Sequence, residues 1–328
     1  MNSVRLFAGF AMAGMAATSC LAQETAQANA RDYPSANIRL IVNVAAGGVT
    51  DAVARIVGQG LYEKWGKPVI VENRVGGNST IAALAVARAP ADGHTLFVTA
   101  DAPFTATPFM VKDLNFSIQD FTPIAIICRP VPVFAVQASL RIKTLRDLVA
   151  LAKSRPGTLN YGSQGLGTYG HLGMEDFIRR AGIRMVHVPY RGGAPALEGL
   201  VRGDVNVLII NYSNIAPFEP SGEVNIIAGA GDRRASLRSD MPIAMETVPG
   251  FSVSTWFGMF GPAGMSPQLV DKIRAGVEDV LASEKSTEFL KTSSCERETA
   301  TPQQFVDLIA SDAKHWKAVI ESVGINPE

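Results

Sequence analysis

Residues 38–51 read IRLIVNVAAGGVTD, and this segment gives the clearest indication of the fold class. The run 38–42 is short, apolar and rich in β-branched residues, which predicts a buried strand. Apolar residues then recur at helical spacing over 52–62, which predicts a helix. In the loop between them, Gly47 and Gly48 allow a tight turn and the close approach of another molecule, because neither has a Cβ atom.

The same alternation continues along the chain. Strands are expected at 68–71 and 95–98 with a helix at 80–88 between them, which predicts a mostly parallel sheet covered by helices. The pattern then restarts, with strands expected at 131–136, 159–161, 185–188 and 205–210 and helices at 144–154, 168–181 and 194–201. Two such units predict two α/β lobes.

Three signals mark helix ends. Gly182 follows a helical pattern and is expected to end it. Pro267 is suited to the first position of a helix, and Thr301 with Gln304 forms a capping box that begins the last one.

The composition agrees with two folded domains. The chain has 328 residues, of which 47% are apolar and 18% charged, and its formal net charge is zero. No run of Lys or Arg exceeds two residues, so the sequence lacks the basic surface typical of nucleic-acid binding. No group of His, Cys, Asp and Glu has the spacing of a metal site.

The N-terminus is typical of a secretory signal. Arg5 precedes an apolar stretch over 6–17, which is too short for a membrane span, and Ala22 and Ala28 are suited to cleavage. A lipoprotein anchored through Cys20 is the less favoured alternative, because residues 17–19 read ATS and lack the leucine usual in a lipobox.

Cleavage leaves Cys128 and Cys295. Cys128 lies in an apolar run, so a buried thiol is the favoured interpretation, although an oxidising compartment permits a disulfide.

Two glycine-containing loops favour an anion. The loop 43–51 precedes a helix whose first N–H groups and dipole attract negative charge. The alternative is a plain turn capped by Thr50 or Asp51. The segment 163–171 also leads from a strand into a helix, and Ser163 and Thr168 could add hydroxyl donors.

Gly165, Gly167 and Gly170 also match the dinucleotide fingerprint G-x-G-x-x-G. The acidic residue expected about 20 positions later is missing, although Arg191 could meet a 2′-phosphate. A dinucleotide-dependent oxidoreductase is disfavoured because the reduced cofactor pool is cytoplasmic. Ser163 also lacks the nucleophile elbow of hydrolases, because Tyr161 occupies its first glycine position.

Several motifs, in their order along the chain, resemble one family. They are Ala45-Ala46-Gly47-Gly48-x-x-Asp51, Val71-Glu72-Asn73-Arg74, Ala91-Asp92-Gly93-His94-Thr95-Leu96, Pro156-Gly157-Thr158-Leu159-Asn160-Tyr161-Gly162-Ser163, His187-Val188-Pro189-Tyr190-Arg191-Gly192 and Trp256-Phe257-Gly258. The mature chain resembles the Bug family, the extracytoplasmic solute receptors of tripartite tricarboxylate transporters.

The resemblance implies an α/β periplasmic binding protein of the type II class, with a small carboxylate held between two lobes. We expect a signal peptide at 1–28, lobe one at 29–128 plus 251–328, and lobe two at 129–250. No enzymatic activity, cofactor or metal is implied. The implied partner is a two-component membrane permease, or a sensor domain where transport is lost, and we expect a monomer in the periplasm.

The expected ligand-binding residues come from the two loops and the neighbouring strand ends. They are Asn43, Ala45, Ala46, Gly47, Gly48, Thr50, Asp51, Thr99, Asp101, Ser163, Gln164, Gly165, Thr168, His171 and Asn211. Asn43, Asp101 and Asn211 depart from the residues usual in the family, so the polar lining of the cleft should be particular to this chain.

We predict that the mature protein begins between Gln23 and Asn29, because small residues suited to cleavage lie just before this range. N-terminal sequencing of periplasmic material tests this prediction. An intact Met1 would contradict it, and a diacylglyceryl group on Cys20 would establish the lipoprotein alternative.

Overall fold

The computed structural model describes residues 31–325. The expected signal segment 1–28, its cleavage sites and Cys20 lie outside the described residues. Among residues 31–325, none of the helices combines the length and the apolar character that a membrane span requires.

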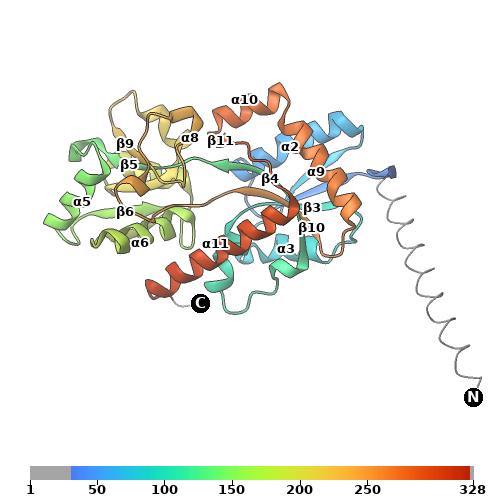
Figure 1. Cartoon of the computed structure of the whole chain (residues 1–328), viewed down its shortest axis with the longest axis horizontal. Helices are drawn as coiled ribbons and strands as arrows, with labels where there is room; N and C mark the ends of the chain where they lie inside the picture. Colours follow the sequence, from blue (N-terminus) through green and yellow to red (C-terminus); the bar gives the residue numbers. More distant parts are fainter. Residues whose placement is uncertain (1–30, 326–328) are drawn as a thin grey trace, which may run out of the picture.

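One half of the molecule is built on a six-stranded sheet in the order β11-β4-β10-β3-β1-β2 (Figure 1). Strand β1 is parallel to β2 and β3, whereas β10 is antiparallel to β3 and β4. The elements of this half are β1 Ile38–Val42, α2 Val49–Trp65, β2 Val69–Asn73, η1 Gly77–Ser79, α3 Thr80–Ala87, β3 Thr95–Ala100, α4 Ala102–Thr105, η2 Thr107–Phe109, η3 Ile118–Asp120, β4 Phe121–Pro130, β10 Phe257–Pro262, α9 Pro267–Leu281, α10 Glu284–Thr292, β11 Cys295–Glu296 and α11 Pro302–Ser322.

The other half is built on a five-stranded sheet in the order β7-β6-β8-β5-β9. Strand β6 is parallel to β7 and β8, and β5 is antiparallel to β8 and β9. Its elements are β5 Pro132–Gln137, η4 Ala138–Leu140, α5 Leu145–Ser154, β6 Asn160–Ser163, α6 Tyr169–Ala181, β7 Val186–Pro189, α7 Gly193–Arg202, β8 Val207–Asn211, α8 Tyr212–Ile215, η5 Ala216–Phe218, β9 Val224–Gly229, η6 Ser236–Arg238 and η7 Ala244–Glu246.

Each sheet is buried on both faces, as the continuous apolar strand patterns predicted. In β1, Leu40 packs with residues of α2 and α9, and Ile41 packs on the opposite face with α3 and the start of α11. In β5, Phe134 packs towards α5 and α6, and Val133 packs towards α7. The α/β, two-lobed fold class is therefore confirmed.

The local end signals are also confirmed. Gly182 ends α6 in the left-handed conformation. Pro267 stands in the first turn of α9. The Thr301 hydroxyl accepts from Gln304 N–H, and Gln304 Oε1 accepts from Thr301 N–H, so the capping box is present. Helix α2 begins at Val49 rather than residue 52, because Gly48 already has the extended conformation of a helix cap.

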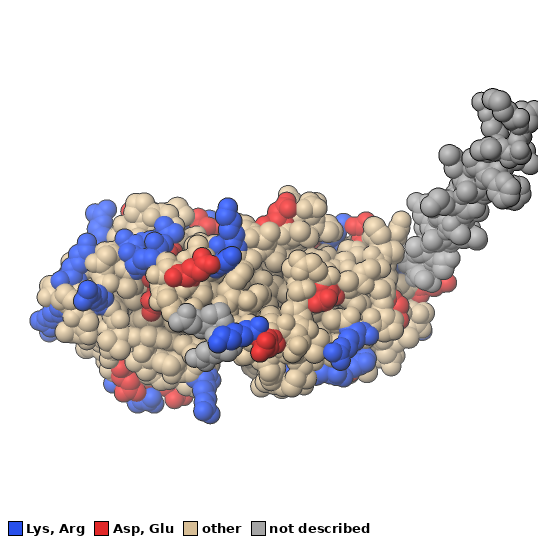
Figure 2. All heavy atoms as spheres, turned by 90° about the horizontal axis from the view of Figure 1, so that it is seen from below, with Lys and Arg blue, Asp and Glu red and all other residues tan. Residues whose placement is uncertain are grey.

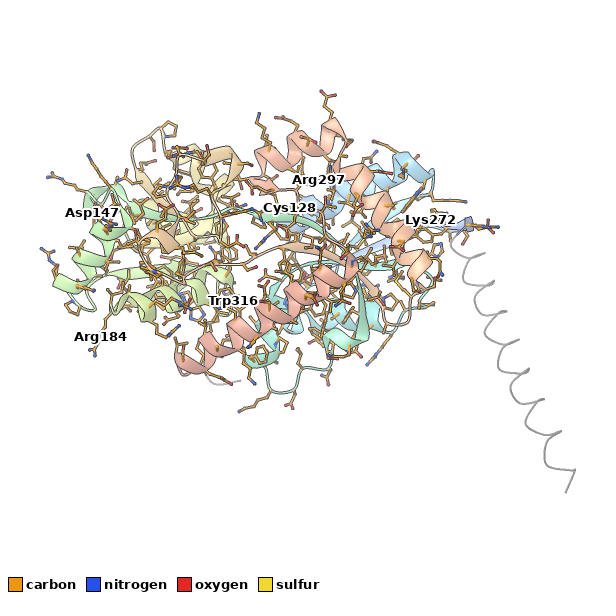
Figure 3. The ribbon with its side chains drawn as sticks, viewed as in Figure 1. Cys128, Asp147, Arg184, Lys272, Arg297 and Trp316 are labelled. Atoms are coloured by element: carbon orange, nitrogen blue, oxygen red, sulfur yellow. A yellow bond between two sulfur atoms is a disulfide. The ribbon has the colours of Figure 1, made fainter. Side chains whose placement is uncertain are left out.

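Helix α11 packs against both halves of the molecule. Phe305, near its start, belongs to the core beside β10, whereas Trp316 and Ile320 belong to the core around α6 (Figure 3). The chain also passes between the sheets at β4–β5 and returns between β9 and β10. The lobe boundaries predicted from the sequence stay a prediction. They assign all of α11 to lobe one, but the second half of α11 packs on the core of the five-stranded sheet.

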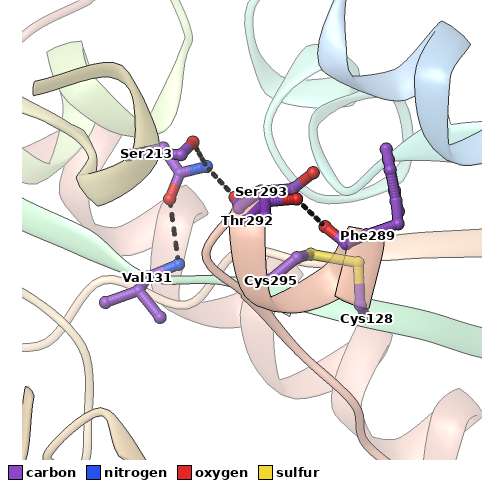
Figure 4. Close-up of a disulfide and its surroundings, with 8 residues drawn as sticks. Cys128, Val131, Ser213, Phe289, Thr292, Ser293 and Cys295 are labelled. Atoms are coloured by element: carbon purple, nitrogen blue, oxygen red, sulfur yellow. Dashed lines mark hydrogen bonds between the residues drawn. A yellow bond between two sulfur atoms is a disulfide. The ribbon is translucent and has the colours of Figure 1, made fainter. Parts of the chain in front are cut away.

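Cys128 and Cys295 form a disulfide with a Cα–Cα distance of 5.6 Å (Figure 4). The favoured interpretation of Cys128 as a buried thiol is therefore wrong. The reason is a long-range pairing, because β11 lies antiparallel to the end of β4 and brings together residues that are 167 positions apart.

We predict that Trp316→Ala lowers the free energy of unfolding by about 3–5 kcal/mol, because a large side chain leaves a packed core. Chemical denaturation followed by circular dichroism measures the change. Val306→Ala on the same helix is the control, since Val306 is 41% exposed. If Trp316→Ala lowered the free energy of unfolding no more than Val306→Ala does, α11 would not stabilise the core around α6.

Candidate functional site

The first candidate anchor is the start of α2. Gly48 is its N-cap, with an extended backbone, and no side chain caps the helix. The first-turn N–H groups of a helix have no intrahelical acceptor, so they remain available to another partner. Residues 45–48 are exposed, whereas Thr50 and Asp51 are buried in the first turn.

Asp51 shapes this loop from within. Its carboxylate accepts from Gly47 N–H at 3.0 Å and from Asn73 Nδ2 at 2.9 Å, and it pairs with Arg55 at 2.9 Å. The hydrogen bond from Arg55 is the main reason that the Asp51 pKa is lowered to about 2. With all these partners, Asp51 positions the loop backbone, which is a different role from the expected ligand contact.

Asn43 and Thr99 lie together beside the loop. Thr99 Oγ1 donates to Asn43 Oδ1 at 3.1 Å, and Asn43 Nδ2 donates to Ser79 Oγ at 2.8 Å. These bonds join the ends of β1 and β3 to η1. Thr99, which the sequence placed at the end of a separate strand, thus lies next to the first loop, and a ligand contact by either residue stays a prediction.

The second candidate anchor is the start of α6. Thr168 is the N-cap, but its side chain does not cap the helix. The Thr168 hydroxyl donates instead to Gly165 O at 2.8 Å. The Ser163 hydroxyl accepts from Gly165 N–H at 3.2 Å and lies 2.7 Å from His187 Nε2. Both hydroxyls therefore hold the loop in shape, and the donors left for an anion are backbone N–H groups.

Gly165 and Gly167 have φ values of +131° and +74°, a region that favours glycine. A Cβ on Gly167 would lie 2.8 Å from Met110 Sδ, which belongs to the other half of the molecule. Both glycines therefore suit the backbone shape of the loop, and Gly167 also lies against the side chain of Met110.

A stack of two histidines lies behind the loop. The rings of His171 and His187 are 4.3 Å apart, and Gly167 N–H donates to His171 Nδ1 at 3.1 Å. Burial lowers the pKa of each to about 4, and for His171 the neighbouring His187 lowers it further. Both rings are thus neutral at pH 7. His187 was not among the expected residues. The sequence signal that could have found it is the family motif over residues 187–192, which begins with this histidine. The pairing of β6 with β7 then brings His187 beside Ser163.

A pocket between the two halves is lined by part of this loop. It is bounded by Asn78, Ala102, Thr107, Met110, Val111, Leu166, Gly167, Thr168, His171 and Ile325. Asn78 adjoins Ser79, the partner of Asn43, so the pocket also lies near the first loop. None of these lining residues carries a formal charge. The pocket is therefore a place for a small molecule held by neutral donors and apolar side chains.

Three of the expected ligand-binding residues form hydrogen bonds with other segments of the protein. Asp101 Oδ1 accepts from Thr255 Oγ1 at 2.9 Å, and burial raises the Asp101 pKa to about 7. Gln164 Nε2 donates to Ile209 O at 2.8 Å. Asn211 Oδ1 accepts from Val131 N–H at 3.2 Å. These side chains stabilise the segments around the site, and the sequence could not indicate their partners because each lies more than 40 positions away.

The sequence profile described as "Tripartite tricarboxylate transporter family receptor" matches residues 53–325. The chain belongs to this family. Its members are solute-binding receptors, so the protein is a receptor and not an enzyme, and the dinucleotide alternative does not hold. The match begins just after the first loop. The choice of that loop as a candidate anchor therefore rests on the sequence pattern and on the start of α2.

Curated relatives cover nearly the whole receptor. It is 31% identical to "UPF0065 protein in tcbD-tcbE intergenic region" of a Pseudomonas species over 98% of this chain and 95% of the relative. It is 29% identical to "Protein BugT" of Bordetella pertussis over 99% of each chain. The resemblance to the Bug family is confirmed.

Solved structures agree with the fold. "R. palustris Rpa4515 with adipate" is 31% identical, with a TM-score of 0.81, over 90% of this chain and 100% of that one. "MatC (Rpa3494) from Rhodopseudomonas palustris with bound malate" is 28% identical, with a TM-score of 0.75, over 88% and 100%. "Structure of periplasmic binding protein BugD" has a TM-score of 0.76 at 26% identity, over 90% and 100%. The receptor is therefore a periplasmic binding protein.

We predict that Gly48→Val removes ligand binding while the receptor still folds. The φ of Gly48 is −74°, and the nearest atoms to an added Cβ are Ala45 O at 3.6 Å and a Val44 methyl at 3.8 Å, so the protein accommodates a side chain there. The valine would instead occupy the space in front of the free N–H groups.

Calorimetric titration and thermal melting measure the two effects of Gly48→Val. Gly231→Val is the matched control, because its added Cβ would meet only Arg233 O at 3.7 Å, outside both loops. Normal binding by the Gly48 variant would mean that the first loop is only a turn.

Proposed function

We propose that the receptor captures a small organic carboxylate between its lobes and delivers it to a two-component membrane permease. The observation that carries this proposal is the pair of long helices, α2 and α6, that begin without a side-chain cap. The start of α6 lines the interlobe pocket, and the first loop is joined to the neighbourhood of Asn78 by the Asn43–Ser79 hydrogen bond. The donors at both starts are backbone N–H groups, which suit an anion.

The physical chemistry of a carboxylate fits these donors. Hydrogen bonds to a charged group contribute about 1.5–3 kcal/mol each, and the helix dipole adds up to ~2 kcal/mol in a partly buried place. His171 is neutral, and its Nδ1 is occupied by Gly167 N–H, so its proton is on Nε2. It can therefore donate a hydrogen bond without the desolvation cost of a buried charge.

The known ligands of similar receptors support an acid. The two relatives from R. palustris were solved with adipate and with malate, which are both carboxylic acids. Ala102, Met110 and Val111 line the same pocket in this receptor, so the body of its ligand should be in part apolar.

Delivery requires that the ligand be enclosed and then released. Closure of the lobes would exclude water and strengthen each polar contact to the acid. The receptor would reach the periplasm by a cleaved signal and act as a monomer. On the face drawn in Figure 2, Lys and Arg gather towards one end with Asp and Glu among them, so this face does not present an extended area of one charge sign.

Native mass spectrometry of receptor purified from periplasm should reveal a bound small acid. A thermal-shift panel that contains adipate, malate, aromatic acids and amino acids, with NAD and NADP as negative controls, would identify the class. If the dinucleotides stabilised the protein and no acid did, the proposed function would be wrong.

We predict that replacing the recognised carboxylate by its amide weakens binding by at least about tenfold, which corresponds to 1.4 kcal/mol. The amide lacks the negative charge that strengthens every bond to the helix starts. Calorimetric titration of the acid and its amide measures the ratio. Equal affinities would exclude an anion anchor at α2 and α6.

A further inference from the structure

A short segment between α10 and α11 is bound to both halves of the molecule. It comprises residues 293–298 and is called the strap below. Strand β11 within it pairs with Arg129 and Pro130 at the end of β4. The Cys128–Cys295 disulfide fixes the strap to that strand, which continues into the five-stranded sheet (Figure 4). The strap thus has a covalent attachment at the crossing point of the chain.

The backbone of the strap is hydrogen-bonded across this crossing point. Val131 N–H donates to Ser294 O at 3.0 Å, and Asn211 Nδ2 donates to Ser293 O at 3.2 Å. Asn211 ends β8, so the second bond reaches the sheet that carries the α6 loop. The same Asn211 accepts from Val131 N–H, which joins the strap, β5 and β8 in one network.

Two acidic side chains extend the attachment. Glu296 accepts from the Ser236 hydroxyl at 2.7 Å, and Ser236 lies after β9. Glu298 accepts from Arg129 at 3.3 Å and from Arg233 at 3.2 Å. The Arg129 side chain is only 12% exposed, so solvent screens its pair with Glu298 less than it screens a surface pair.

The strap lies away from the ligand loops. In the first sheet β11 is an edge strand, and β1 is four strands away, which at about 4.8 Å per strand is roughly 19 Å. In the second sheet Ser236 follows the edge strand β9, whereas the α6 loop follows β6 near the other edge. The strap therefore ties the lobes at the edge away from the candidate site, whereas α11 packs on both halves beside the pocket, which Ile325 helps to line.

We propose that the strap, fixed by the Cys128–Cys295 disulfide, is a hinge element that holds the two lobes within a narrow range of orientations. Loss of the disulfide would leave the strap held to β4 by the short β11 pairing alone and would weaken its bonds to the second lobe. The range of lobe orientations would then widen. The consequence for the ligand rests on the proposed function. If fewer molecules have the lobe orientation that binds the acid, the apparent Kd rises in inverse proportion to that fraction.

The orientation is tested without any ligand. Spin labels on Tyr62→Cys and Lys153→Cys, at exposed positions of α2 and α5, report the distance between the lobes. In this background, replacing Cys128 and Cys295 by serine should widen the distance distribution. The exchange of the Val131 amide should accelerate about tenfold, while amides within β1 keep their rates. An unchanged distribution together with unchanged exchange at Val131 would overturn the proposal.

A second variant keeps the proposal testable if the double serine protein does not fold. Glu298→Gln retains the disulfide and removes the charge paired with Arg129 and Arg233. It should also widen the distribution. Lys64→Gln is the matched control, because it breaks an exposed ion pair with Asp279 inside one lobe. A response of Glu298→Gln no larger than that of Lys64→Gln would contradict the role of the strap.

These readouts separate the two proposals. If the lobes loosen but the acid and its amide bind equally, the strap stands and the carboxylate proposal fails. If the acid is preferred but the distances do not change, the strap proposal fails and the carboxylate proposal stands.

Discussion

The first turn of an α-helix contains N–H groups that have no hydrogen-bond acceptor within that helix, and the proposed binding site of this receptor depends on that constraint. Helices α2 and α6 leave these groups without a side-chain cap. The nearby polar side chains keep the loops in shape, as Asp51 does through Gly47 and Ser163 through Gly165. The donors are consequently rigid parts of the backbone, which lowers the entropy lost when a ligand binds.

A second group of segments holds the two lobes together. The crossing strands, the disulfide-linked strap and α11 all connect the halves. Polar bonds predominate in the strap, whereas α11 contributes packing through Trp316. A receptor must both enclose and release its ligand. The proposed role of the strap fits both needs, because a tie at the edge away from the site would limit the direction of motion, while the apolar packing of α11 joins the halves beside the pocket.

Much of the fold could be predicted from local patterns. The strand at β1, the glycine loop and the helix α2 follow one another in the sequence, and their periodicities are visible without any partner. The same holds for the Thr301 capping box, which is formed within four residues. The side-chain roles at the site could not be predicted in this way. Ser163 and Thr168 have the right chemistry for a ligand, but their hydroxyls bond to the loop that contains them.

Local sequence patterns were enough to establish the α/β class, the two lobes and the receptor family, and to select the two loops of the proposed anion site. These properties depend on residue periodicity and on short motifs, which neighbouring residues specify. The three-dimensional packing was needed to show that Asp101 and Asn211 bond to the segments that cross between the sheets, that His187 stacks on His171, and that the two cysteines pair. Each of these depends on a contact between segments distant in the chain, and such contacts are settled by how the sheets and helices pack.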